Sequence, residues 1–163
     1  MQSLKSWKPA VVALLAALAL SSMAPIRAGE REIFPAPQKA ESDLSDALQA
    51  AAAAHKRVIV DFGGNWCVDC QVLDIFMHDR ENAPLLEANY VLVHVNIGQM
   101  DRNLDIAARY HIPISKGVPA LAVLDEHGTL LYSQQTGEFE AMSRMRSRAV
   151  TSFLEQWKPA NQG

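Results

Sequence analysis

Short apolar runs alternate along this chain with segments whose hydrophobic residues recur at helical spacing. The runs RVIVDFGG (57–64) and YVLVHVNI (90–97) are rich in β-branched residues and predict two buried strands. The segment PALAVLDEHGTLLYSQQ (119–135) predicts a hairpin that turns at Asp125 to Gly128. Helical spacing predicts five helices, at 42–55, from Cys67 onward, at 82–89, at 101–110 and at about 140–158.

Three finer expectations concern these helices. Ser42 is a good N-cap for the first one. Leu104, Ile106 and Ala107 are expected to face the core from the fourth helix. A stripe of core residues is expected along the last helix, made of Met142, Met145, Ala149, Phe153 and Trp157.

This order of elements predicts an α/β fold. Strands that alternate with helices form a parallel pair, and the hairpin adds antiparallel strands. In such sheets, ligands and reactive groups gather at the carboxyl ends of the strands. Cys67 lies just beyond the first predicted strand, so we expect the functional site at that edge of the sheet.

The composition is that of a globular domain. Hydrophobic residues make up 49% of the 163 residues and charged residues 20%, which is typical of a chain with a packed core. The formal net charge is −3 and no basic run is present, so a nucleic-acid partner is not expected.

The N-terminus has the pattern of a secretory signal. Lys5 and Lys8 precede an apolar stretch of 15 residues that ends before Pro25, short of the roughly 20 needed to span a bilayer. We expect cleavage after Ala28 and a periplasmic location, whereas an uncleaved segment would anchor the protein in the membrane. The expected organisation is a signal peptide (1–28), a linker or loose N-terminal arm (29–41), one domain (42–158) and a C-terminal tail (159–163).

The chain has two cysteines, Cys67 and Cys70. A thiol at the start of a helix meets unpaired N–H groups and the positive end of the helix dipole, so the pKa of Cys67 should fall below its free value of roughly 8.5. Cys70 lies nearly one turn later on the same face, where it can close a disulfide with Cys67. An exposed, activated thiolate with a resolving thiol beneath it is suited to disulfide exchange, so we expect Cys67 to be exposed.

Asp61 interrupts the apolar run VIVDF. Alternation along the strand places Val58, Val60 and Phe62 on one side, and Asp61 on the other with Ile59. Desolvation should raise the pKa of Asp61 and make it a proton acceptor near neutral pH. The alternative is a structural aspartate that pairs with neighbouring backbone or with His94.

Other uses of the cysteine pair are open at this point. A zinc site would need two histidines as further ligands, and no His-x3-5-His pair is present. A copper-handling protein would need a histidine that converges on the cysteines, with Met77 as a helper. A structural disulfide would close too small a loop to stabilise the chain much. A redox-inactive binding module is the remaining class.

The segment VIVDFGGNWCVDC (58–70) resembles the active-site segment of the thioredoxin superfamily, with an aspartate six positions before the first cysteine and a tryptophan just before it. KGVPAL (116–121) resembles the segment that holds the family's cis-proline. WCVDC together with TGEF (136–139) is similar to the C-terminal domain of periplasmic thiol:disulfide interchange proteins. The resemblance implies a thioredoxin fold, in which helices flank a central mixed sheet.

The resemblance also implies an activity, that of an exported thiol–disulfide oxidoreductase, and a role for each matching residue. Cys67 would attack the substrate and Cys70 would resolve the mixed disulfide. Asp61 would handle a proton, with His94 as a relay where many thioredoxins have lysine. Trp66 would cap the site, and a cis peptide before Pro119 would leave the backbone of Val118 free to pair with substrate.

The same resemblance implies protein thiols and disulfides as substrates, a dedicated membrane or periplasmic electron donor, and no cofactor or metal beyond the disulfide itself. Three departures from the family pattern bear on function. Val68 and Asp69 replace the usual Gly-Pro, His94 replaces lysine, and HIPISKG (111–117) is a longer approach to the proline. A carboxylate at Asp69 disfavours the Cys67 thiolate, so we expect a reductase.

Overall fold

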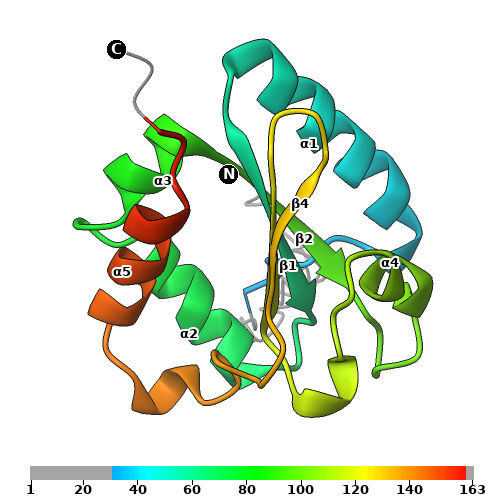
Figure 1. Ribbon diagram of the computed structural model, residues 1–163. Coiled ribbons are helices and arrows are strands. Elements are labelled where there is room, and N and C mark those ends of the chain that lie inside the picture. The colour runs from blue at the N-terminus through cyan, green and yellow to red at the C-terminus, as the bar shows by residue number, and fades with distance from the viewer. Residues whose placement is uncertain (1–30, 161–163) are drawn as a thin grey trace, which may run out of the picture.

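A four-stranded mixed sheet forms the centre of the computed structural model, which describes residues 31–160 (Figure 1). The strand order is β2-β1-β3-β4. β1 is parallel to β2 and antiparallel to β3, and β3 is antiparallel to β4. The strands are β1 (Arg57–Gly63), β2 (Tyr90–Asn96), β3 (Ala120–Leu124) and β4 (Leu130–Ser133). The predicted strands and the mixed α/β sheet are therefore confirmed.

Helices cover both faces of this sheet (Figure 1). The α-helices are α1 (Ala40–Ala54), α2 (Val68–Met77), α3 (Ala83–Asn89), α4 (Leu104–Arg109) and α5 (Arg148–Trp157). Three short 3-10 turns complete the structure, η1 (Pro37–Lys39), η2 (Ile114–Lys116) and η3 (Met142–Arg144). Within residues 31–160, every helix is too short or too polar to cross a membrane.

Strand β1 lies between two hydrophobic clusters, one on each face of the sheet. Val58, Val60 and Phe62 pack with residues of α1 and α4. Ile59 packs on the opposite face with residues of α2, α3 and α5. This division matches the alternation predicted from the sequence, and it places Asp61 on the face that α2 covers.

The first residues of three helices differ from the sequence prediction by more than one residue, and one of the three is α4, which begins at Leu104 rather than at 101. α1 begins at Ala40 rather than after Ser42, so Ser42 is not the N-cap, and its hydroxyl donates to the Lys39 carbonyl from inside the first turn. α5 begins at Arg148, because the chain is extended at Met145 and ends the turn η3 there. Met142, expected in the last helix, is instead buried in η3.

Leu104 was expected to face the core, and this prediction is wrong. α4 has six residues and follows Asn103, whose backbone is left-handed. As the first residue of this short helix, Leu104 is 44% exposed, whereas Ile106 and Ala107 are buried as expected.

Residues 31–36 form no helix or strand, but they are not loose. Phe34 is 3% exposed. The Asn65 amide accepts hydrogen bonds from the backbone of Ile33 and Phe34 and donates one to the Phe34 carbonyl. These contacts correct the expectation of a loose arm for this segment, while the expected signal peptide lies outside the described residues.

Gln134 joins the segment after β4 to the start of β3. Its buried side chain accepts from Leu121 N–H (3.2 Å) and donates to the Pro119 carbonyl (3.1 Å). The side chain therefore satisfies two buried backbone groups next to the loop that faces the cysteines.

Gln134→Ala should lower the free energy of unfolding by about 1–3 kcal/mol, because two buried backbone groups lose their partner. Urea titration measures the change. Gln135→Ala is the control, since Gln135 is exposed and its loss should cost less than about 0.5 kcal/mol. Equal effects of the two substitutions would contradict the role assigned to Gln134.

Candidate active site

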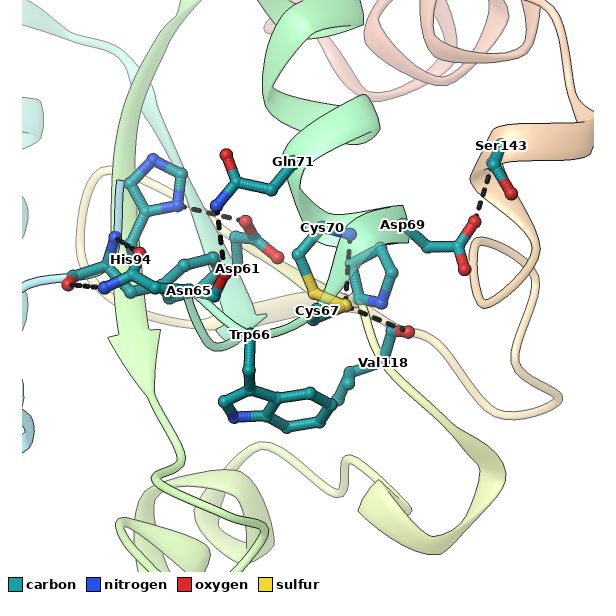
Figure 2. The surroundings of a disulfide bond; sticks show 12 residues. Asp61, Asn65, Trp66, Cys67, Asp69, Cys70, Gln71, His94, Val118 and Ser143 are labelled. Carbon is teal, nitrogen blue, oxygen red and sulfur yellow. Dashed lines mark hydrogen bonds and ion pairs between the residues drawn. A yellow bond between two sulfur atoms is a disulfide. The ribbon is translucent and has the colours of Figure 1, made fainter. Parts of the chain in front are cut away.

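Cys67 lies at the N-terminus of α2, four residues after the end of β1. It forms a disulfide with Cys70, and the two Cα atoms are 5.2 Å apart (Figure 2). Cys67 is the N-cap of the helix, and its sulfur accepts the Cys70 backbone N–H at 3.1 Å. The sulfur therefore receives an N–H group that the first turn of a helix leaves unpaired, as expected for a thiol at this position.

The two cysteines differ in their access to solvent. Cys67 is 6% exposed, which is less than we expected for an attacking thiol, and Cys70 is fully buried. The Val118 carbonyl oxygen lies 3.7 Å from Cys67 Sγ and covers part of it. The peptide bond between Val118 and Pro119 is cis.

Trp66 forms the exposed rim of the site, with 41% of its surface accessible. Its indole N–H donates to the Gly98 carbonyl in the loop after β2. A Cβ at position 64 would lie 2.6 Å from the indole nitrogen, so Gly64 allows the ring to fold back against the chain. Trp66 is thus held beside the cysteines rather than in the core.

Asp61, which is buried, and His94, which is partly buried, form a pair across β1 and β2. The parallel register places them side by side, and His94 Nδ1 lies 3.0 Å from Asp61 Oδ2. Asp61 therefore does pair with His94, the alternative considered above. Its other oxygen, Oδ1, is buried without a hydrogen-bond partner among the described residues.

Burial and charge shift the pKa values of both members of this pair. Burial raises the pKa of Asp61 above its ordinary value, and His94 lowers it by less. Burial lowers the pKa of His94, but the hydrogen bond to Asp61 and the charges of Asp61 and Asp74 outweigh burial and raise it. The pair therefore holds protons more tightly than the same groups would in water. Figure 2 shows Asp61 between His94 and the disulfide.

Asp74 is a second buried carboxylate that the sequence analysis missed. Its side chain is 5% exposed and lies 3.9 Å from His94 Nε2, so the imidazole has a carboxylate near each nitrogen. Arg31 donates to Asp74 at 2.7 Å, and His78 Nδ1 lies 3.1 Å from it. An acidic residue on the apolar face of α2, one turn after Cys70, was the signal that could have identified it.

Asp69 points away from the disulfide (Figure 2). Its Oδ1 accepts the backbone N–H of Ser143 at 2.7 Å. This residue between the cysteines therefore ties the start of α2 to the turn η3, a contact for which the sequence offered no signal.

The two features expected of a copper site do not converge on the cysteines. His94 is engaged by Asp61 and Asp74, and Met77 is buried in the cluster formed with α5. Among residues 31–160, no group of three or more histidine, cysteine or acidic side chains is arranged to hold a metal ion.

Similarity to known sequences covers most of the described chain. Residues 39–126 match the family model described as thioredoxin-like. The chain is 25% identical over 122 residues to the thiol:disulfide interchange protein DsbD of Pseudomonas fluorescens. That alignment covers 73% of this chain but 19% of DsbD, so the chain spans about a fifth of this relative.

Solved structures give the same fold. A disulphide isomerase from Xylella fastidiosa Temecula1 is 30% identical and superposes with a TM-score of 0.70 over 76% of this chain and 95% of that one. A thioredoxin from Thermus thermophilus, 22% identical, has a TM-score of 0.52 over 69% of this chain and 81% of that one, and shows the fold alone. Because the family model covers more than half of the chain and the isomerase is similar over nearly its full length, this protein belongs to the thioredoxin-like family.

Proposed function

We propose that this protein is an exported thiol–disulfide oxidoreductase that reduces protein disulfides through Cys67 and Cys70. The observation that carries the proposal is the disulfide at the start of α2, in which Cys67 is the N-cap and Cys70 is fully buried. A substrate can reach only the first of these sulfurs. The disulfide is the redox group, and no further cofactor or metal is part of the proposal.

The reaction transfers two electrons from the dithiol to the substrate disulfide. The Cys67 thiolate attacks one substrate sulfur, and the other leaves as a thiolate, which gives a mixed disulfide. Cys70 then loses its proton and attacks Cys67 Sγ, so that the substrate leaves as a second thiolate. The products are a reduced substrate and the Cys67–Cys70 disulfide.

Asp61 and His94 are proposed to take the proton that Cys70 loses. One buried oxygen of Asp61 has no hydrogen-bond partner within residues 31–160, and His94 holds the other oxygen. A carboxylate whose pKa is raised by burial is a stronger base than one in water. The second carboxylate, Asp74, stabilises the protonated form of His94.

The surroundings of Cys67 favour the reducing direction. The Val118 carbonyl oxygen, 3.7 Å from Cys67 Sγ, repels a thiolate and can accept a hydrogen bond from a thiol. Asp61 and Asp69 add carboxylates on either side of the disulfide (Figure 2). A less stable thiolate means a less stable reduced form, so the protein gives up its electrons readily.

The rim of the site suits an extended protein substrate. Trp66 offers an exposed aromatic surface, and the backbone of Val118 faces the reactive sulfur beside the cis Pro119. The similarity to DsbD supports protein thiols and disulfides as substrates, a periplasmic location and a dedicated electron donor in the membrane or periplasm. Export itself rests on the predicted signal peptide.

Cys67 should react with iodoacetamide at least about tenfold faster than Cys70 in the reduced native protein, because only Cys67 has any access to solvent. Peptide mass spectrometry of samples quenched at intervals measures both rates. Equal rates in the folded protein would contradict the proposed division of labour, while equal rates in denaturant serve as the control.

Asp61→Asn should stabilise the protein more as the pH rises from about 5 to about 9, reaching on the order of 1–3 kcal/mol. Asp61 and His94 both have raised pKa values, so the folded wild type binds more protons than the unfolded chain. The stability that these protonated groups give to the wild type is lost as the pH rises through the pKa values of Asp61 and His94 in the folded protein. Urea titrations of both proteins across this range measure the difference, and a difference that does not change with pH would contradict it.

The redox potential tests the reductase proposal directly. Equilibration with glutathione should place the pair on the reducing side of the glutathione couple. Asp69→Asn should raise the potential by roughly 10–30 mV, since about 30 mV corresponds to 1.4 kcal/mol for two electrons and the carboxylate points away. The asparagine keeps an oxygen for Ser143 N–H, and Asp105→Asn on the exposed face of α4 is the control. A potential above that of glutathione would mean an oxidase or isomerase instead.

A further inference from the structure

Residues 31–36, referred to below as the arm, are held across the edge of the active site by side-chain amides. Asn65, which directly precedes Trp66, makes three hydrogen bonds to the backbone of Ile33 and Phe34. Gln71 of α2 donates to the Arg31 carbonyl at 2.9 Å, and Asn96 at the end of β2 donates to the Pro35 carbonyl at 2.8 Å. Three separate parts of the site therefore fix the arm in one position.

Phe34 brings this arm against the buried pair and the resolving cysteine. Its ring packs edge-on against His94, with the ring centroids 4.9 Å apart. A Cβ at position 63 would lie 2.7 Å from Phe34 Cζ and 2.7 Å from Cys70 Sγ. Gly63 thus lets the Phe34 ring and the Cys70 sulfur pack over the same point of β1, where they exclude water from the Asp61 side.

Arg31 places a positive charge beside the second carboxylate. It donates to Asp74 at 2.7 Å, and Asp74 lies 3.9 Å from His94 Nε2. The negative charge of Asp74 acts on both His94 and Asp61, and the guanidinium of Arg31 offsets part of that charge. The arm therefore contributes both an apolar cover and a charge to the groups beside Cys70.

We propose that the arm is a fixed cover over the Asp61–His94 pair, and that Phe34 and Arg31 are positioning residues for the step in which Cys70 resolves the mixed disulfide. The proposal rests on the proposed function, in which Asp61 accepts the Cys70 proton. Phe34 keeps water away from Asp61. Arg31 lowers the proton affinity of Asp61, so that this carboxylate is deprotonated when Cys70 must lose its proton.

The charged groups around His94 come from four elements. Asp61 faces it from β1 and Asp74 from α2, and His78 of α2 contacts Asp74. Arg31 reaches the same carboxylate from the arm. On the other side of the edge strand, Asp43 and Asp46 of α1 line a shallow groove with His94. Arg31 is thus the one arginine or lysine among the described residues that contacts the Asp74 side of the cluster.

The test uses an aromatic disulfide reagent whose released thiolate absorbs visible light. One equivalent releases a first thiolate when Cys67 attacks and a second when Cys70 resolves the mixed disulfide, so stopped-flow absorbance separates the two steps. Arg31→Gln should shift the pH midpoint of the second step upward by about half a unit, because the exposed cation acts through Asp74 at several ångströms. The first step should change little.

Two variants control for the loss of charge. Arg31→Lys should keep the wild-type midpoint. Arg109→Gln, which breaks the exposed ion pair between Arg109 and Glu41, should also leave it in place. An unchanged midpoint in Arg31→Gln, or the same shift in Arg109→Gln, would overturn the role of Arg31.

Phe34→Ala tests the cover with a readout that does not depend on activity. In a Cys67→Ser background the only thiol is Cys70, and its iodoacetamide labelling should rise at least about fivefold when the ring is removed. Phe34→Leu should stay near the parent rate. Thermal melting of each variant confirms that it is folded, and a folded Phe34→Ala variant with unchanged labelling would overturn the cover.

The stopped-flow assay also separates this inference from the proposed function. A wild-type protein that releases only the first thiolate would contradict the proposed exchange chemistry. A wild type that releases both thiolates, with all arm variants indistinguishable from it, would contradict only the role of the arm.

Discussion

The burial of strand β1 on both faces is the constraint on which the site depends. Two hydrophobic clusters enclose the strand, so its position is fixed from α1 on one side and from α2 and α5 on the other. The chain leaves this strand at Gly63 and reaches Cys67, the N-cap of α2, four residues later. The reactive sulfur is therefore set at a helix N-terminus by the packing of the core, not by a flexible loop.

The burial of β1 also explains why Asp61 pairs with His94. A carboxylate on a strand with no access to water must find a partner or take up a proton, because leaving it charged and alone costs too much free energy. Register supplies the partner, since Asp61 lies directly opposite His94 on β2. Burial keeps the pKa of Asp61 raised. One of its oxygens has no hydrogen-bond partner among the described residues, which leaves an acceptor on the side of the disulfide (Figure 2).

Segments on either side of the catalytic helix complete the site through backbone contacts. Asn65, before α2, binds the backbone of the arm, and Asp69, in the first turn of α2, binds the backbone of Ser143 in η3. Both residues lie within two positions of Cys67, so the segment around the cysteines itself holds the arm and the turn η3 in place. The residues before and between the cysteines therefore stabilise the tertiary structure as well as act on the sulfur chemistry. Their side chains do more than set the redox potential.

Local patterns in the sequence determined the strands, the helix that starts at Cys67 and the two sides of β1, because strand alternation and helix capping depend on neighbouring residues. They also indicated Asp61, since a lone acid in an apolar run is visible without a structure. The same kind of signal marks Asp74, an acid on the apolar face of α2, but Arg31 and Phe34 could not be assigned to the site in this way. Arg31 lies 43 positions from Asp74. Residues 29–40 contain two prolines and show no periodicity from which the position of the arm could be inferred. Only the tertiary structure decided that α2 brings Asp74 near His94, and that the arm brings Phe34 against His94 and Arg31 against Asp74. These contacts depend on the whole sheet being assembled.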